Sequence, residues 1–220
     1  MVIIFSLLLA LLLFLFTFYY YTRDDLYFIR KGVSMEQLFN ILLSGLLGSL
    51  LFSRLLAIIF NLNIGRISQA QTYLSSRPLG ISVFGAIAGL FLSYLLMTRK
   101  NKALRKRFFD YVSVSLLAAL PILFLGVFIN FYLFIMHIIL FIFYVFVLVP
   151  KYNSGKMRTG SLCLIFLIMF SLVSFLNDIF LLYTQEILLS RESFLLVGLF
   201  IASCFFLLRL ESYKTTKNSK

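Results

Sequence analysis

Charged side chains are scarce in this chain, and their scarcity decides its class. Asp, Glu, Lys and Arg make up 13% of the 220 residues, whereas hydrophobic residues make up 62%. A soluble domain carries roughly 25% charged residues, because polar groups must cover much of its surface. The composition therefore excludes an ordinary soluble protein and favours a chain that lies mostly in lipid.

Residues that bind metals or form disulfides are nearly absent as well. The chain has one histidine and two cysteines, Cys163 and Cys204, and both cysteines stand in apolar stretches, where they pack as small hydrophobic residues. There is no CxxC pair and no Cys/His cluster, so the sequence predicts no metal, no cofactor and no disulfide. No lysine occurs inside an apolar stretch, which excludes a retinal Schiff base. No Ser/His/Asp arrangement indicates nucleophilic catalysis.

The chain is instead rich in apolar blocks long enough to cross a bilayer, which needs about 20 residues of α-helix. These blocks cover residues 1–21, 37–62, 79–98, 109–130, 132–149, 160–183 and 193–208. The first block lacks a basic start and a small-residue cleavage site, which favours a span over a signal peptide. The predicted fold class is all-α: a polytopic membrane protein with about seven transmembrane helices, or six or eight if the short break at 130–132 is misplaced. One helical domain is predicted over 1–210, followed by a polar cytoplasmic tail over 211–220.

The basic residues predict the orientation. Of the 20 Lys and Arg, only Arg66, Arg77 and Arg191 stand in links on one side, whereas nearly all the others stand in the alternate links and the tail. The positive-inside rule then places the N-terminus outside and the C-terminus in the cytoplasm. A net charge of +12 is common in nucleic-acid-binding proteins. Here the charges flank spans, so they are interpreted as topology determinants that face anionic lipid, and no nucleic-acid partner is predicted.

Polar residues at membrane depth are the candidates for a site, because each costs several kcal/mol unless it is paired or wet. Arg54 is interpreted either as a clamp for a lipid phosphate or as a structural ion pair or snorkelling side chain, with Asp178 as its partner. His137 is either a neutral, hydrogen-bonded core residue or a base. Asn130 stands at the tip of a helical hairpin, where it caps the chain or serves a site. Asp110, beside a basic link, is predicted to form a surface ion pair.

Small residues mark two further features. Gly85 and Gly89 form a GxxxG spacing that favours close helix packing and is the alternative to a lipid-binding role for the same residues. Pro121 and Gly126 predict a kink or a thin place in the fourth span.

Five stretches, taken in order, resemble motifs of the bacterial prolipoprotein diacylglyceryl transferases. They are Arg30–Leu38 with Gly45, Gly48 and Ser53-Arg54-Leu55; Tyr73-Leu74 with Pro78; Gly80–Gly89; Phe124–Asn130; and Gly160–Leu162 with Ser174–Asp178. The resemblance implies a seven-span protein of the bacterial inner membrane. Its partners would be phospholipid, above all phosphatidylglycerol, and the signal peptide of a prolipoprotein. The expected activity is transfer of a diacylglyceryl group to a lipobox cysteine.

The resemblance carries over residue by residue, and it breaks at several positions. It implies a catalytic set of Arg54, Asn130 and Asp178, with His137 as a substitute base, and lipid contacts at Arg54, Gly85, Gly89 and Gly126. The family's histidine and two of its arginines are replaced here by Phe84, Phe124 and Ser174. Because phenylalanine neither accepts a proton nor holds a phosphate, the alternative is an inactive family member that binds lipid or lipoprotein.

Overall fold

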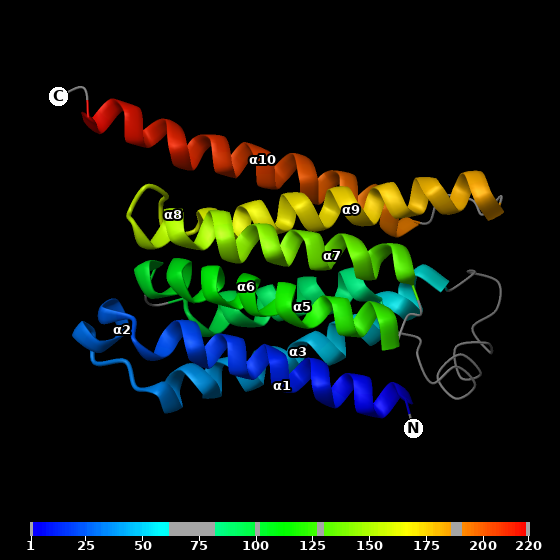
Figure 1. The fold of residues 1–220 in the computed structure, drawn as a ribbon, viewed down its shortest axis with the longest axis horizontal. Helices are drawn as coiled ribbons and strands as arrows, with labels where there is room; N and C mark the ends of the chain where they lie inside the picture. Colours follow the sequence, from blue (N-terminus) through cyan, green and yellow to red (C-terminus); the bar gives the residue numbers. More distant parts are fainter. Residues whose placement is uncertain (1, 62–81, 100–101, 127–129, 186–190, 219–220) are drawn as a thin grey trace. The chain divides into compact units, whose positions relative to one another are not determined.

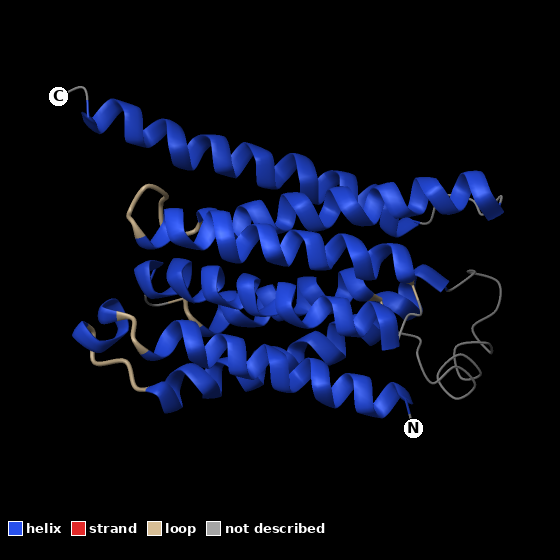
Figure 2. Cartoon of the chain, viewed as in Figure 1, coloured by secondary structure: helices blue, strands red, loops and turns tan. Residues whose placement is uncertain are grey.

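The computed structural model describes residues 2–61, 82–99, 102–126, 130–185 and 191–218, and every regular element in these ranges is a helix (Figures 1 and 2). The elements are α1 (Val2–Arg23), α2 (Leu26–Arg30), α3 (Met35–Asn61), α5 (Val83–Met97), α6 (Lys102–Gly126), α7 (Phe131–Phe143), the π-helix η1 (Tyr144–Leu148), α8 (Val149–Asn153), α9 (Ser161–Gln185) and α10 (Arg191–Asn218). The predicted all-α class is confirmed. The motif at Tyr73 and Pro78 lies outside the described residues, as does the segment 127–129.

Six of the described helical stretches are long and apolar enough to cross a membrane. They are Ile3–Arg23, Met35–Ile59, Leu104–Gly126, Phe131–Asn153, Ser161–Leu181 and Ser193–Leu210. Large apolar side chains cover their outer surfaces; Phe146, for example, is 74% exposed. Such surfaces suit lipid, so the chain is a multi-pass membrane protein by helix length and composition. The third predicted span corresponds to α5, whose 15 residues rise only about 22 Å, so the count of seven stays a prediction.

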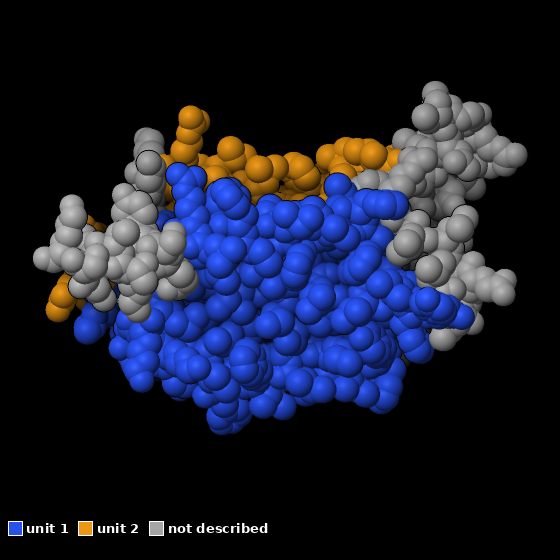
Figure 3. All heavy atoms as spheres, turned by 90° about the horizontal axis from the view of Figure 1, so that it is seen from above, with its two compact units in different colours: residues 1–26, 106–220 blue, residues 27–105 orange. Residues whose placement is uncertain are grey.

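The chain divides into two compact units (Figure 3). Unit 1 comprises residues 1–26 and 106–220, and unit 2 comprises residues 27–105. The chain therefore passes from one unit to the other twice, after residue 26 and after residue 105. The single domain predicted over 1–210 stays a prediction.

Unit 1 is organised around α6. In the most apolar window of α6, 78% of the residues are buried, against 17–28% in the other five long stretches. Phe108 of α6 packs edge-on against Phe18 of α1, with ring centroids 5.3 Å apart. Further along α6, the ring of Phe124 lies 4.7 Å from that of His137 on α7. In unit 1, α6 is thus the central helix, while the more exposed helices carry the lipid-facing side chains.

The stretch Phe131–Asn153 changes its helical geometry part-way along. Residues Tyr144–Leu148 form a π-helix, in which the N–H of Val149 donates to the carbonyl of Tyr144, five residues back. Pro150 follows directly. A proline has no N–H to donate, and its ring collides with the carbonyl four residues earlier. The wider π-turn removes that collision, which explains why the helix expands just before the proline.

Unit 2 is built on an antiparallel pair, α3 and α5. A β-carbon at Gly45 or Gly48 of α3 would meet Tyr94 or Ser93 of α5, and one at Gly89 would meet Phe52. Successively later residues of α3 thus contact successively earlier residues of α5, so the two helices run antiparallel. The hydroxyl of the fully buried Tyr94 donates to the carbonyl of Leu42 at 3.1 Å. Small residues therefore let these two helices approach closely, as the GxxxG spacing predicts.

Candidate functional site

Asn130 lies at the start of α7, in the hairpin between α6 and α7. Its backbone N–H donates to the carbonyl of Phe124 at 2.8 Å, which closes the hairpin. Its side-chain oxygen accepts from the N–H of Leu133 at 3.0 Å and caps α7. Its side-chain nitrogen donates to the side-chain oxygen of Asn177 on α9, also at 3.0 Å. The predicted cap is therefore present, and both ends of the amide are engaged within the protein.

Asp178, the next residue along α9, has a partner on α10. The hydroxyl of Ser193 donates to its carboxylate, and Ser193 is 2% exposed. Asn130, Asn177, Asp178 and Ser193 thus tie α7, α9 and α10 together at one end of unit 1. Asn130 contacts Asn177, and Asp178 is the next residue of α9. Two of the predicted catalytic residues, Asn130 and Asp178, therefore lie at the same end of unit 1.

His137 lies two turns further along α7 and is fully buried. Its Nδ1 lies 2.8 Å from the carbonyl oxygen of Leu133, one turn back on its own helix. A carbonyl only accepts, so Nδ1 carries the proton and Nε2 has a free lone pair. That Nε2 has no hydrogen-bond partner among the described residues. The ring packs between Phe124 and Phe170, at centroid distances of 4.7 and 6.0 Å.

Three polar residues follow a seven-residue repeat from the cap of α7 into η1. They are Asn130, His137 and Tyr144, which stand on one helical face about 10 Å apart along the axis. They meet α9 at successive levels: Asn177, Phe170, and the carbonyl of Leu162, which accepts from the Tyr144 hydroxyl at 3.0 Å. Two of the three levels pair a donor with an acceptor, and the His137 level does not.

We expect His137→Leu to leave the protein folded and as stable as the wild type, or more stable by about 1 kcal/mol. The substitution removes a buried acceptor that has no donor, and an apolar group of similar size fits between two phenyl rings. Thermal unfolding in detergent measures the change. A large loss of stability would mean that Nε2 has a partner that holds the core together.

Arg54 lies on α3 in unit 2, and its side chain is exposed. Leu50, Leu51 and Leu55 beside it are 60, 67 and 52% exposed, so this guanidinium stands on an apolar, lipid-facing surface. It has no ion pair or hydrogen bond within its unit among the described residues. The apolar helical stretch Met35–Ile59 ends five residues later, so a flexible arginine side chain reaches the headgroup level from this position.

The three glycines assigned to lipid contact all lie against protein. A β-carbon at Gly85 would lie 2.9 Å from the carbonyl oxygen of Phe52, and one at Gly89 would lie 2.8 Å from that of Gly48. A β-carbon at Gly126 would collide with Ser6 of α1. The structure gives these glycines a packing role; a lipid contact at any of them stays a prediction.

The sequence interpretation of Asp110 was wrong, because Asp110 is fully buried and not on the surface. Its carboxylate accepts from the backbone N–H groups of Gly160 at 2.6 Å and of Cys163 at 2.9 Å. These are orphan donors at the start of α9, where the helix dipole also favours a negative group. Gly160 turns its N–H toward Asp110 with φ +98°, a conformation that glycine adopts readily. Asp110 therefore caps α9 from α6.

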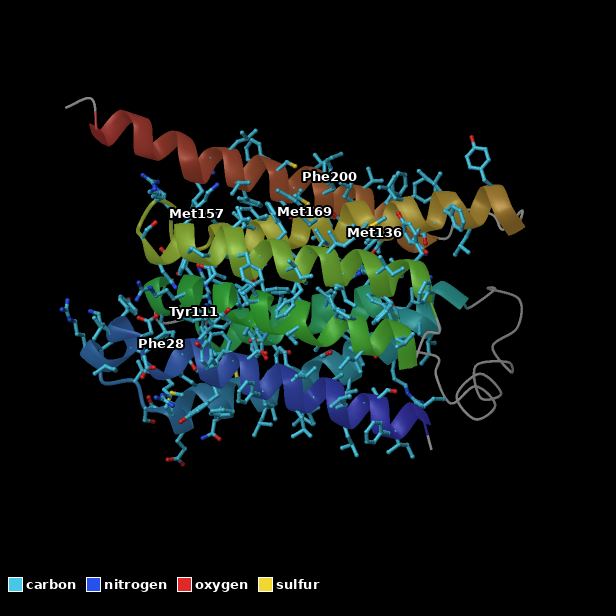
Figure 4. All side chains as sticks on the ribbon, in the orientation of Figure 1. Phe28, Tyr111, Met136, Met157, Met169 and Phe200 are labelled. Carbon is cyan, nitrogen blue, oxygen red and sulfur yellow. The ribbon has the colours of Figure 1, made fainter. Side chains whose placement is uncertain are left out.

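A second cluster, which the sequence did not indicate, surrounds Asp25. The carboxylate of Asp25 accepts from Nη1 of Arg107 and from the hydroxyl of Tyr111, the latter at 2.6 Å. Tyr111 lies on α6 (Figure 4), and its ring meets that of Tyr152 edge-on at 6.3 Å. These residues gather at the end of unit 1 opposite to Asn130.

The comparisons with known proteins add no neighbour: no family model, no curated protein and no solved structure matches this chain. Among the described residues, no three His, Cys, Asp or Glu side chains lie together as metal ligands would.

Proposed function

We propose that this chain is a non-catalytic, multi-pass membrane protein that binds anionic phospholipid, above all phosphatidylglycerol, through Arg54. The observation that carries the proposal is the exposed guanidinium among exposed leucines on α3. A cation on a lipid-facing surface needs an anionic partner or water, and a lipid phosphate offers two oxygens in a geometry that a guanidinium matches. Phosphatidylcholine has the same phosphate, but its choline cancels the charge.

The contacts of the other candidate residues support binding without chemistry. Asn130 and Asp178 are engaged by Asn177 and Ser193, and His137 is enclosed by two phenyl rings. Phe84, Phe124 and Ser174 stand where the diacylglyceryl transferases that this chain resembles have a histidine and two arginines. The side chains that those enzymes would use are therefore missing here. We therefore propose a transferase-like fold that does not carry out the transfer reaction.

The second candidate is an active diacylglyceryl transferase of the bacterial inner membrane. The order of the five motifs supports it, as does the lone pair on His137 Nε2, the one histidine base of the chain. In this version, His137 replaces the missing histidine and accepts the thiol proton of the lipobox cysteine, and the thiolate displaces glycerol phosphate from the diacylglyceryl group of phosphatidylglycerol.

We also propose seven crossings, with the N-terminus outside and the C-terminus in the cytoplasm. The contact between Asp25 and Arg107 supports this count. It joins the end of α1 to the start of α6, so the chain returns to the same end of unit 1 after α3. Because α3 is long enough to cross, a second crossing is needed before α6, and α5 is the described helix that supplies it.

Proteoliposomes with phosphatidylglycerol and a lipobox-cysteine peptide distinguish the two candidates. The proposal predicts that the peptide keeps its mass while a known transferase lipidates it in parallel. A mass gain of one diacylglyceryl group, absent from the Cys→Ser peptide, would establish the enzyme and overturn the non-catalytic proposal.

The binding itself depends on Arg54. We expect Arg54→Gln to weaken retention of phosphatidylglycerol about tenfold relative to phosphatidylcholine, because a charge-assisted hydrogen bond is lost. Native mass spectrometry from mixed-lipid micelles measures both lipids in one spectrum. Arg99→Gln is the matched control, since Arg99 is another exposed arginine of unit 2. Equal preference for phosphatidylglycerol in the Arg54 variant and in the wild type would refute the assignment.

A further inference from the structure

Four basic residues of unit 1 surround the loop 154–160, which joins α8 to α9 and contains Met157 (Figure 4). They are Lys106 of α6, Lys151 of α8, and Lys156 and Arg158 of the loop itself, and we call them the basic cluster. The loop lies between two stretches that are long enough to cross a membrane, Phe131–Asn153 and Ser161–Leu181. A loop in this place stands at the level of the lipid headgroups.

Backbone and side-chain contacts hold the basic cluster together. The N–H of Lys156 donates to the carbonyl of Lys151 at 3.0 Å. A β-carbon at Gly160 would lie 3.7 Å from Cδ of Lys106, so the stem of this lysine passes beside the end of the loop. Nη1 of Arg158 donates to a backbone carbonyl of α10 at 2.7 Å. The loop is thus fixed to α6, α8 and α10, and the four positions stay close together.

The carboxylates described at this end of unit 1 are engaged elsewhere. Asp25 and Asp110 accept from donors of the protein, and the exposed Asp24 has its own arginine partner. Lys106 and Lys151 are exposed, and neither forms an ion pair with a described residue. The basic cluster therefore presents positive charge at the surface, and its charge is complementary to an anion.

An exposed apolar surface adjoins the basic cluster. Phe143 and Phe146 are 39 and 74% exposed, and the exposed Pro150 directly precedes Lys151. These residues occupy the turns of the stretch Phe131–Asn153 that lead up to the loop. The acyl chains of a lipid can lie on such a surface while its headgroup meets the cations. A free anion would gain nothing from it, so the combination indicates a lipid.

We propose that the basic cluster binds a phospholipid whose headgroup carries two phosphates, and that the acyl chains of this lipid lie along Phe143 and Phe146. Phosphate oxygens accept charge-assisted hydrogen bonds from lysine and arginine. Each phosphate diester carries one negative charge, so a headgroup with two of them is attracted to the cluster more strongly than phosphatidylglycerol, which has one. The cluster belongs to unit 1, and it uses different residues from the contact proposed for Arg54 in unit 2.

Native mass spectrometry of the full-length protein tests this site, with cardiolipin as the lipid with two phosphates. The protein carries Arg54→Gln throughout and is released from micelles that contain cardiolipin and phosphatidylglycerol, so the result does not depend on the Arg54 contact. We expect Lys106→Gln with Lys151→Gln to lower the preference for cardiolipin about 25-fold, a factor of about five for each lysine. An unchanged preference in this variant would overturn the proposal.

A charge-matched variant separates a site from general attraction. Arg30→Gln with Lys31→Gln removes two exposed cations of unit 2 and is expected to keep the parent preference for cardiolipin. An equal loss in the two double variants would mean that net charge alone acts, and it would overturn the site. If the Lys106 and Lys151 double variant does not fold, as judged by circular dichroism, Lys151→Gln alone is measured, with an expected loss of about fivefold.

Inorganic pyrophosphate distinguishes a lipid from a free anion as the occupant. It also carries two phosphate groups, but it has no acyl chains to lie on the apolar surface beside Lys151. We expect excess pyrophosphate to leave cardiolipin bound to the parent protein. Displacement of cardiolipin by pyrophosphate would show that the cluster takes soluble anions, and it would overturn the assignment to a lipid.

Discussion

Asp110→Ala is expected to lower the free energy of unfolding by about 3 kcal/mol. The substitution leaves the N–H groups of Gly160 and Cys163 without this acceptor and removes the negative group from the start of α9. Loss of a helix cap costs about 0.5–2 kcal/mol, and a hydrogen bond to a charged group contributes about 1.5–3 kcal/mol. These effects overlap, because the same two bonds make the cap, so about 3 kcal/mol is expected and not their sum. Unfolding by SDS in mixed micelles, followed by circular dichroism, measures the change.

Two matched variants give this prediction its control. Asp110→Asn keeps one carbonyl oxygen as an acceptor but loses the charge, so about half of the destabilisation is expected. Asp24→Ala removes an exposed carboxylate and is expected to change stability by less than about 0.5 kcal/mol. If Asp110→Ala were as stable as Asp24→Ala, the carboxylate would not be the cap of α9.

The spans could be predicted from the sequence because lipid imposes a simple rule on composition. The second block, predicted over 37–62, is observed as Met35–Asn61, and the sixth, predicted over 160–183, is observed as Ser161–Gln185. Every backbone polar group in hydrocarbon must be bonded within its own segment, so a long apolar block is almost obliged to be a helix. The third block, predicted over 79–98, shows the limit of the rule: the helix there has 15 residues, because it starts only after its cap, Ser82.

The partners of the polar residues could not be predicted, because each pairing joins distant parts of the chain. Asp110 stands next to a basic link, which indicates a surface ion pair, but its donors are N–H groups about 50 residues away. Backbone donors leave no mark in the sequence beyond the glycine at 160. Asn130 was predicted as a cap from its place in the hairpin, whereas its bond to Asn177 depends on how α7 and α9 align. Local patterns thus predict caps and spans, and tertiary register decides the pairs.

Gly89→Ala is expected to destabilise the pair of helices in unit 2 by about 2–3 kcal/mol, the cost of forcing an extra carbon into a packed contact. The new β-carbon would lie 2.8 Å from the carbonyl oxygen of Gly48 and closer still to the β-carbon of Phe52. A backbone oxygen in the middle of α3 does not rotate away as a side chain does, so α3 and α5 must separate. SDS titration measures the loss, and hydrogen exchange in α3 and α5 locates it.

Gly198→Ala on α10 provides the opposite case with the same chemical change. Apart from the backbone of its own helix and its two chain neighbours, no described atom lies within 4 Å of a β-carbon built there. Only helix propensity acts, so a gain of about 0.5–1 kcal/mol is expected. The contrast also bears on the lipid role assigned to Gly89 from its motif. If Gly89 serves packing alone, Gly89→Ala loses stability while any folded fraction keeps the lipid preference set by Arg54. A loss of lipid preference without a loss of stability would instead make Gly89 part of the lipid contact.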